Sequence, residues 1–358
     1  MAGIRLDDVS KVFGGHTALE HLNLDIADGE FFVLLGPTGA GKTTTLRLIA
    51  GLEKPTTGTV SIGGEDVSTW SAAERDVALV FQHYSLYPRY TVRENLEFPL
   101  KSNVRRTPRD EIDARVAKAA KTLRIEHLLE RKTDRLSGGE MQRVSIGRAI
   151  VREPRAFLMD EPLSNLDAKL REALRAELKD LQMTLGATVL FVTHDQVEAM
   201  SMGDRVGVLN EGRIIQIGTP YEIYNKPRDL FVAGFVGSPA MNVLQGEIAG
   251  DRIVVRQGAL ELPLEAAGRA RLGAASGAVA VGIRSEDIRL GPDQPIAARV
   301  HDVENHGVEQ VVTLRVDDCQ LRATVPAIHP VAVESTVRFG LDQAKLHGFD
   351  PRTGLRLG

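Results

Sequence analysis

The chain has 358 residues, enough for two domains, and its 43% hydrophobic and 26% charged residues are typical of a soluble protein with a full core. A formal net charge of -4 gives no general reason to expect nucleic acid as a partner. The single cysteine excludes an intramolecular disulfide, and no apolar run approaches the roughly 20 residues of a membrane-spanning helix, so we expect any membrane association to pass through a partner.

Short apolar runs alternate with helical patterns over residues 1–235, which predicts an α/β domain with a mostly parallel sheet. The run FFVLL (31–35) indicates a buried strand, and TTTLRLIAGL (43–52) indicates the helix after it. Between them, GPTGAGKT (36–43) matches the phosphate-loop pattern G-x4-GK[ST] in the strand–loop–helix context that this pattern requires. These residues predict a P-loop NTPase fold.

The same loop predicts a site for a nucleoside triphosphate. Backbone N–H groups at a helix start attract phosphate oxygens, Lys42 adds a positive charge, and the Thr43 hydroxyl is placed to bind Mg²⁺. The nucleotide-binding residues expected in this loop are Gly36, Pro37, Thr38, Gly39, Ala40, Gly41, Lys42, Thr43 and Thr44.

Residues 86–153 have a mostly helical pattern. A helix is expected to begin within residues 107–110, and its basic residues alternate with acids, which favours a solvated face over a nucleic-acid patch. The stretch LSGGEMQR (136–143) places a serine and two glycines at another helix start, a second element suited to an anion. The apolar face of the first helix is predicted to contain Ile112, Val116, Ala119 and Leu123.

Further buried strands are expected at 156–161 and 187–194. Asp160 should emerge at the end of the first of them, beside the phosphate loop, and hold Mg²⁺ through water, while Glu161 should orient or activate the attacking water. An acidic pair at a strand end is ordinary alone, and the phosphate loop is what favours this interpretation. Between the two strands, a helix is predicted with Asp167 as its N-cap and Gly186 at its end.

After residue 235, short strands separated by turn residues predict a small β-barrel, OB-like domain over residues 236–358. A helix that starts near Thr219–Glu222 is expected to link it to the nucleotide-binding domain, residues 1–235, whose helical subdomain covers about 86–153. The Ala/Gly-rich stretch 266–280 is expected to be a loop of the barrel domain.

These motifs together, in this order, resemble those of ATP-binding cassette (ABC) ATPases. LSGGEMQR resembles the signature motif of that family, and SNLD (164–167) resembles the loop that crosses the dimer interface through Asp167. By the same resemblance, Phe13 in KVFGG stacks on adenine, Gln82 in VFQHYSLYP senses Mg²⁺ and the attacking water, and His194 in VTHD contacts the γ-phosphate. Taken singly, these three side chains have ordinary interpretations as core or surface residues.

The resemblance implies a head-to-tail dimer, either a homodimer or a heterodimer with a paralogue. Ser137, Gly138 and Gly139 of one subunit would bind the γ-phosphate of ATP held by the phosphate loop of the other. The usual signature glutamine is Glu140 here, and its carboxylate is expected to point away from the anion because like charges repel.

The resemblance also implies ATP and Mg²⁺ as cofactors and assigns roles to the residues around them. The catalytic residues would be Glu161, His194 and Gln82, and the metal would be held by Thr43, Gln82 and Asp160.

The last third of the chain narrows the family further. FVAGFVGSPAMNVLQGEI, VGIRSEDI and LHGFDPRTGLRL resemble the C-terminal regulatory domain of the maltose/glycerol-3-phosphate type of sugar importer ATPase. This implies a peripheral, energy-coupling subunit on the cytoplasmic face of the inner cell membrane, beneath two transmembrane permease subunits. An extracytoplasmic solute-binding protein would deliver the solute, and Tyr84–Arg89 would form the groove for a permease helix.

Two alternatives stay open at this point. An importer ATPase for a polyamine or an ion would also carry a β-barrel tail, and the segment GSPAMN favours a sugar over these solutes. A soluble, non-transport ABC ATPase that acts on nucleic acid or ribosomes is disfavoured by the acidic pI of about 6.2 and by the importer-type tail.

Overall fold

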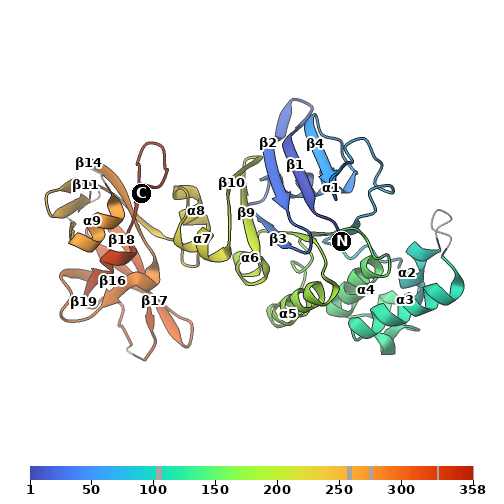
Figure 1. The fold of residues 1–358 in the computed structure, drawn as a ribbon. Helices are drawn as coiled ribbons and strands as arrows, with labels where there is room; N and C mark the ends of the chain where they lie inside the picture. Colours follow the sequence, from blue (N-terminus) through green and yellow to red (C-terminus); the bar gives the residue numbers. More distant parts are fainter. Residues whose placement is uncertain (102–106, 256–259, 274–276, 329, 358) are drawn as a thin grey trace. The chain divides into compact units, whose positions relative to one another are not determined.

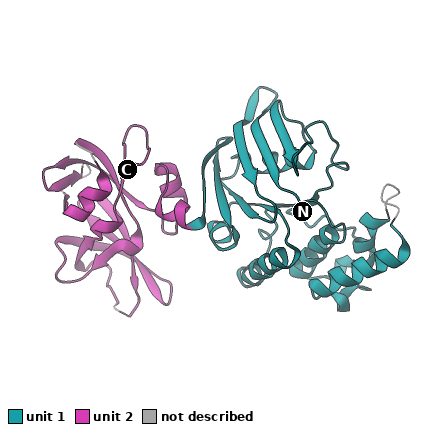
Figure 2. Cartoon of the chain, in the orientation of Figure 1, with its two compact units in different colours: residues 1–220 teal, residues 221–358 magenta. Residues whose placement is uncertain are grey.

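The computed structural model describes residues 1–101, 107–255, 260–273, 277–328 and 330–357. The chain forms two compact units, Met1–Pro220 and Tyr221–Gly358, which Figure 2 shows in teal and magenta. The units divide before the boundary expected from the sequence at residue 235, so the limits 1–235 and 236–358 stay a prediction about functional domains.

The first unit contains a six-stranded sheet in the order β10-β9-β3-β8-β7-β6. Figure 1 labels its strands β10, β9 and β3. All neighbouring strands are parallel except β10, which pairs antiparallel with β9, so the prediction of a mostly parallel sheet is confirmed. Every residue of β3 and β8 is buried, as expected for strands covered on both faces. The strands are β3 (Phe31–Leu35), β6 (Ala78–Val80), β7 (Phe157–Asp160), β8 (Val189–Thr193), β9 (Arg205–Asn210) and β10 (Arg213–Gly218).

A second sheet of the first unit, ordered β2-β1-β4-β5, is antiparallel and was not expected from the sequence. Several register shifts interrupt the pairing of β1 with β2, and these shifts break the strict alternation by which a strand is recognised. The apolar faces of this sheet and of helix α1 (Lys42–Ala50) share one hydrophobic core with the six-stranded sheet. The strands are β1 (Ile4–Phe13), β2 (His16–Ile26), β4 (Thr57–Ile62) and β5 (Glu65–Asp66).

The stretch between β6 and β7 is helical, as expected. Helices α2 (Val92–Glu97), α3 (Arg109–Thr122) and α4 (Gly138–Ile150) pack beside one another (Figure 1). Short 3-10 helices connect them at Phe98–Leu100, Glu126–Leu128 and Thr133–Arg135. The predicted apolar face of α3 is confirmed, since its four residues are all buried: Ile112, Val116, Ala119 and Leu123.

Helix α5 (Ala168–Leu185) has the limits predicted for it. Asp167 accepts a hydrogen bond from the N–H of Leu170 at 3.0 Å, and Gly186 ends the helix with φ 59°, a conformation that glycine adopts without strain. Helix α6 (Gln196–Met202) follows β8. None of the helices in the described part of the chain is long and apolar enough to cross a membrane.

The boundary between the units falls at the start of α7 (Pro220–Asn225), and α8 (Leu230–Phe235) follows in the second unit. Helix α7 starts where the sequence predicted a helix. Two five-stranded antiparallel sheets follow, and their inner faces share one hydrophobic core, in line with the predicted OB-like β domain. One sheet contains β11 (Asn242–Ala249), β12 (Arg252–Val255), β13 (Glu261–Pro263), β14 (Gly277–Ile283) and β20 (His347–Phe349). The other contains β15 (Ile288–Leu290), β16 (Ile296–Asn305), β17 (Glu309–Val316), β18 (Cys319–Pro326) and β19 (Thr336–Leu341).

The prediction of a loop at 266–280 is wrong for most of that stretch. Residues Ala266–Leu272 form helix α9, and β14 begins at Gly277, while 274–276 lie outside the described residues. Alanine favours a helix, and the buried Leu272 anchors this one in the core of the second unit. Ala266, Ala267 and Ala270 therefore lie in a short helix, and Ala278 and Ala280 lie in strand β14.

A buried guanidinium joins the first helices of the second unit to its sheets. Arg284, 2% exposed, donates hydrogen bonds to the carbonyls of Ala233, Val236 and Tyr224, the last at 2.9 Å. Its guanidinium also lies 4.0 Å from the centre of the Tyr224 ring. Three backbone acceptors thus depend on one side chain.

We predict that Arg284→Met lowers the free energy of unfolding by about 3 kcal/mol, because buried carbonyls lose their donors. Thermal and denaturant unfolding of the full chain would measure the change. Arg289→Met is the control, since Arg289 is exposed and pairs with Asp342 at 2.8 Å, and it should cost less than about 1 kcal/mol. Equal effects of the two substitutions would contradict the structural role of Arg284.

Candidate active site

A cavity of about 600 Å³ in the first unit brings together residues from distant parts of the chain. Phe13, Gln82, Asp160, Glu161 and His194 all line it, together with most of the phosphate loop. The remaining lining residues are His16, Ala18, Thr38, Gly39, Gly41, Lys42, Thr43 and Thr44. The predicted residues that do not line it are Gly36, Pro37, Ala40, Ser137, Gly138, Gly139 and Asp167.

The phosphate loop connects β3 to α1 by a path that requires glycine. A Cβ atom on Gly36 would lie 2.3 Å from the carbonyl oxygen of Leu209, and Gly41 has φ 107°. The loop also contains Pro37 and Ala40, the latter buried in the core that α1 shares with both sheets. The start of α1 therefore faces the cavity with N–H groups that have no partner within the helix.

Lys42, 5% exposed, lies at the first residue of α1. Its ammonium group donates to the carbonyls of Gly36 at 2.9 Å and Pro37 at 3.0 Å, and it lies 3.6 Å from the carboxylate of Glu161. Burial lowers the pKa of Lys42, and the charge of Glu161 opposes that shift. A phosphate in the cavity would offer this buried cation a stronger partner than the loop carbonyls do.

Thr43 and Asp160 form an oxygen-rich corner of the cavity that fits Mg²⁺. The Thr43 hydroxyl donates to the Asp160 carboxylate at 3.2 Å, and burial raises the pKa of Asp160. A cation beside Asp160 would offset this cost, and hydroxyl and carboxylate oxygens are the donors that Mg²⁺ prefers. Gln82 lines the same cavity, although its amide nitrogen donates to Ser164 at 3.2 Å.

Glu161 and His194 interact directly. The Nδ1 atom of His194 lies 2.9 Å from the Glu161 carboxylate, and the histidine side chain is more exposed than the glutamate. Glu161 has φ 45°, a conformation that costs free energy for a residue other than glycine and that often occurs at functional sites. Its N–H donates to the carbonyl of Val192 at 2.9 Å, which helps to hold this conformation against strand β8.

The SNLD loop contacts both sides of the cavity within one chain. The Ser164 hydroxyl donates to the carbonyl of Glu161 at 2.9 Å, and the side chain of Asn165 donates to the carbonyl of Gln82 at 2.8 Å. Asp167 caps α5 and so sets where the loop ends. The loop thereby connects the glutamine segment to the candidate base.

Arg171, which the sequence analysis missed, connects this loop to the histidine segment. Its guanidinium donates to the carbonyl of Leu166 at 3.1 Å and lies 3.3 Å from the carboxylate of Asp195, which follows His194. Asp195 in turn caps α6 by accepting from the N–H of Val197 at 2.7 Å. A lone arginine on an amphipathic helix carries no sequence signal for such a role.

Phe13 is 41% exposed at the end of β1, and the ammonium group of Lys11 lies 4.5 Å from the centre of its ring. An exposed aromatic ring at the cavity rim is available for stacking on a base. His16, across the turn at the start of β2, lines the same cavity and was not identified from the sequence. Only its place directly after GG in KVFGGH hinted at it.

The signature motif lies at the start of α4. Ser137 is the N-cap, and its hydroxyl accepts from the N–H of Glu140. A Cβ atom on Gly139 would lie 2.6 Å from a methyl carbon of Leu170 in α5, so this glycine is also required by packing within the chain. Glu140 folds back onto its own helix start, where its carboxylate accepts from the N–H of Ser137 at 2.7 Å.

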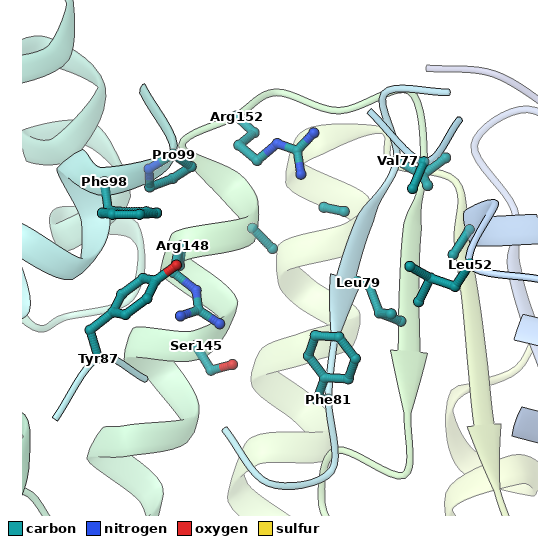
Figure 3. A pocket seen from close by; sticks show the side chains of 14 residues that line it. Leu52, Val77, Leu79, Phe81, Tyr87, Phe98, Pro99, Ser145, Arg148 and Arg152 are labelled. Carbon is teal, nitrogen blue, oxygen red and sulfur yellow. The ribbon is translucent and has the colours of Figure 1, made fainter. Parts of the chain in front are cut away.

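A second cavity of the first unit, about 300 Å³, is a groove between helical residues and strand β6 (Figure 3). Phe81, Tyr87 and Phe98 leave apolar surface exposed there. Ser145 and Arg148 of α4 donate to the carbonyls of Tyr84 and Ser85, at 2.9 and 2.6 Å. The predicted segment 84–89 contributes Tyr87 to this groove.

Three family models match the chain. Residues 19–164 match the model of the ABC transporter family, residues 237–288 match that of the MalK OB fold domain, and residues 281–349 match that of the TOBE domain. The chain is 48% identical over 378 residues to the trehalose/maltose import ATP-binding protein MalK of Thermococcus litoralis, which covers 99% of both chains. It is 49% identical over 363 residues to the sn-glycerol-3-phosphate import ATP-binding protein UgpC of Brucella abortus, covering 98% of this chain and 97% of that one. A solved dimeric post-hydrolysis structure of the ATP-binding cassette MJ0796, bound to ADP and Pi, is 34% identical with a TM-score of 0.54, over 61% of this chain and 98% of that chain.

We predict that Arg171→Met lowers the rate of nucleotide hydrolysis about tenfold with little change in nucleotide affinity, because it frees the SNLD loop from the histidine segment. Steady-state kinetics would separate kcat from KM, and Arg171→Lys should restore part of the loss. Lys179→Met is the control, since Lys179 lies on the same helix and pairs with Asp204 at 2.6 Å. A kcat for Arg171→Met equal to that of the control would contradict the positioning role.

Proposed function

The chain belongs to the ABC transporter family, and we propose that it is the ATP-hydrolysing, energy-coupling subunit of an importer for a sugar or sugar-like solute. The observation that carries this function is the cavity in which the phosphate loop meets Asp160, Glu161 and His194. The full-length similarity to import ATP-binding proteins, including the OB and TOBE segments, supports an importer over a soluble ABC ATPase. Relatives named for trehalose/maltose and for sn-glycerol-3-phosphate favour a sugar-like solute over a polyamine or an ion.

ATP binds in the cavity, with its phosphates at the start of α1 and its adenine against Phe13. The N–H groups of the loop and the ammonium group of Lys42 bind the β- and γ-phosphates, in exchange for the loop carbonyls that Lys42 now contacts. Thr43 and Asp160, with Gln82 nearby, would hold Mg²⁺, and such an ion would supply positive charge to the phosphate oxygens.

Hydrolysis transfers the γ-phosphoryl group to water. The water oxygen bonds to phosphorus as the bond to the β-γ bridging oxygen breaks, and the products are ADP and inorganic phosphate. Glu161 accepts the proton of the water, while His194 orients Glu161 and contacts the γ-phosphate. The carboxylate of Glu161 is held between the ammonium group of Lys42 and the ring of His194.

Two subunits associate head to tail around ATP, either as a homodimer or with a paralogue. The signature residues Ser137, Gly138 and Gly139 lie outside the cavity of their own chain, as expected if they serve the cavity of a partner. Asp167 contributes to the same interface. ATP favours the closed dimer because both halves bind it, and hydrolysis removes that preference.

The groove at Tyr87 and Phe98 binds a helix of a transmembrane permease subunit. The protein is then a peripheral subunit at the cytoplasmic face of the inner membrane. Exposed aromatic side chains around a groove suit an amphipathic helix. Helix α4 carries Ser137 at its start and Ser145 and Arg148 beside the groove, so one rigid element connects the signature to the permease. An extracytoplasmic solute-binding protein delivers the solute to the permease.

We predict that Glu161→Gln binds ATP but lowers the rate of hydrolysis at least about 100-fold, because it removes the general base. The variant should accumulate as an ATP-bound dimer, which light scattering would detect. Hydrolysis at the wild-type rate would contradict the assignment of Glu161. Ser137→Arg in the same background should bind ATP and stay monomeric, and dimerisation of that double variant would contradict the cross-dimer role.

We also predict that Phe98→Glu prevents stable association with the permease subunits, because it places a charge in the apolar groove. Co-purification with the permease would measure this, while the ATPase activity of the isolated subunit should be unchanged. Met183→Glu, an exposed apolar position on α5 that does not line the groove, is the control and should assemble normally. Normal assembly of Phe98→Glu would exclude this groove as the docking site.

A further inference from the structure

We infer that Glu140 positions the signature serine for the partner's ATP and, through its charge, weakens ATP-driven closure of the dimer. This inference rests on the proposed function, because it concerns the γ-phosphate bound across the dimer. The residue that departs from the usual signature would then set how much ATP the dimer needs to close.

The geometry begins with a reciprocal pair of hydrogen bonds at the start of α4. The Glu140 carboxylate accepts from the N–H of Ser137 at 2.7 Å, and the Ser137 hydroxyl accepts from the N–H of Glu140 at 3.4 Å. This capping box takes up two of the donors that a helix start leaves unpaired. The N–H groups of Gly138 and Gly139 are the next donors at the same helix end.

The capping box also orients the serine hydroxyl. A hydroxyl has one proton to donate and lone pairs to accept with. Because the oxygen of Ser137 already accepts from the helix backbone, its proton is left to be donated away from α4. Glu140 thus holds Ser137 by two groups: its carboxylate accepts from the Ser137 backbone N–H, and its own backbone N–H donates to the Ser137 hydroxyl.

The same side chain brings a negative charge to this helix end. The hydrogen bond from the Ser137 backbone lowers the pKa of Glu140, so the carboxylate is ionised at neutral pH. Arg131 lies 3.7 Å from it, and both side chains are partly exposed, so the pairing offsets the charge only in part. A γ-phosphate that approaches Ser137 from a partner is therefore repelled by Glu140.

Glutamine separates the two effects, because its amide oxygen can accept from Ser137 while the side chain carries no charge. Glu140→Gln should keep the serine in place and lower the ATP concentration for half-maximal dimerisation about tenfold, the order expected when a unit charge that repels the phosphate is removed. Glu140→Ala removes both the charge and the side-chain hydrogen bond to Ser137, so it should not lower the ATP concentration for dimerisation in this way.

The test measures ATP-driven dimerisation of the full chain in the Glu161→Gln background, at low and at high salt. The gain of Glu140→Gln should be largest at low salt and shrink at high salt, because salt screens charge. Glu94→Gln is the matched control: Glu94 makes the same capping box with Thr91 at the start of α2, and its ATP dependence should be unchanged. Thermal unfolding of each variant checks that the helix starts are intact.

Coincident ATP titrations for Glu140→Gln and its parent at both salt concentrations would overturn the inference. An equal gain in Glu94→Gln would also overturn it, because the effect would then belong to capping boxes in general. If the Glu161→Gln parent did not dimerise with ATP at all, the proposed dimer would fail, and the inference would fall with it. A gain restricted to Glu140→Gln at low salt supports it.

Discussion

The parallel pairing of β3, β8 and β7 is the constraint on which the candidate site depends. Register places Leu35 opposite Thr193 and Asp160 opposite Val192. Parallel strands leave a sheet at the same edge, and neighbours lie only about 5 Å apart. The phosphate loop after β3, the acid pair at the end of β7 and the histidine after β8 therefore meet without any long side chain having to reach across the fold.

This edge of the sheet holds charges that are taken out of water before any nucleotide is bound. Burial lowers the pKa of Lys42 and raises the pKa of Asp160, because it disfavours the charged form of each. The carboxylate of Glu161 lies near both Lys42 and His194. Buried charges of both signs around a cavity suit a ligand that brings a polyanion and a cation together. The positive φ of Glu161 is consistent with a side chain held for chemistry rather than for stability.

Helix α4 and the SNLD loop connect the cavity at this edge of the sheet to surfaces outside it. Gly139 lets α4 approach Leu170 of α5, and Arg171 on α5 contacts the loop and the histidine segment. The other half of α4 holds the segment at Tyr84 and Ser85 beside the apolar groove. Contiguous hydrogen bonds and close packing thus join three candidate functional regions of one unit, which is the physical basis for coupling between them.

The sequence by itself determined the features that depend on neighbours along the chain. Spacing alone identified the phosphate loop, the acids after a buried strand and the limits of α5 at Asp167 and Gly186, because loops, caps and buried strands have local signals. Only the tertiary structure decided the antiparallel sheet of β1 and β2, the helix at Ala266–Leu272, the place of His16 in the cavity and the contacts of Arg171 and Glu140. Register shifts, close packing and side-chain contacts between distant segments leave no periodic trace in the sequence, and for that reason they could be read only from the folded chain.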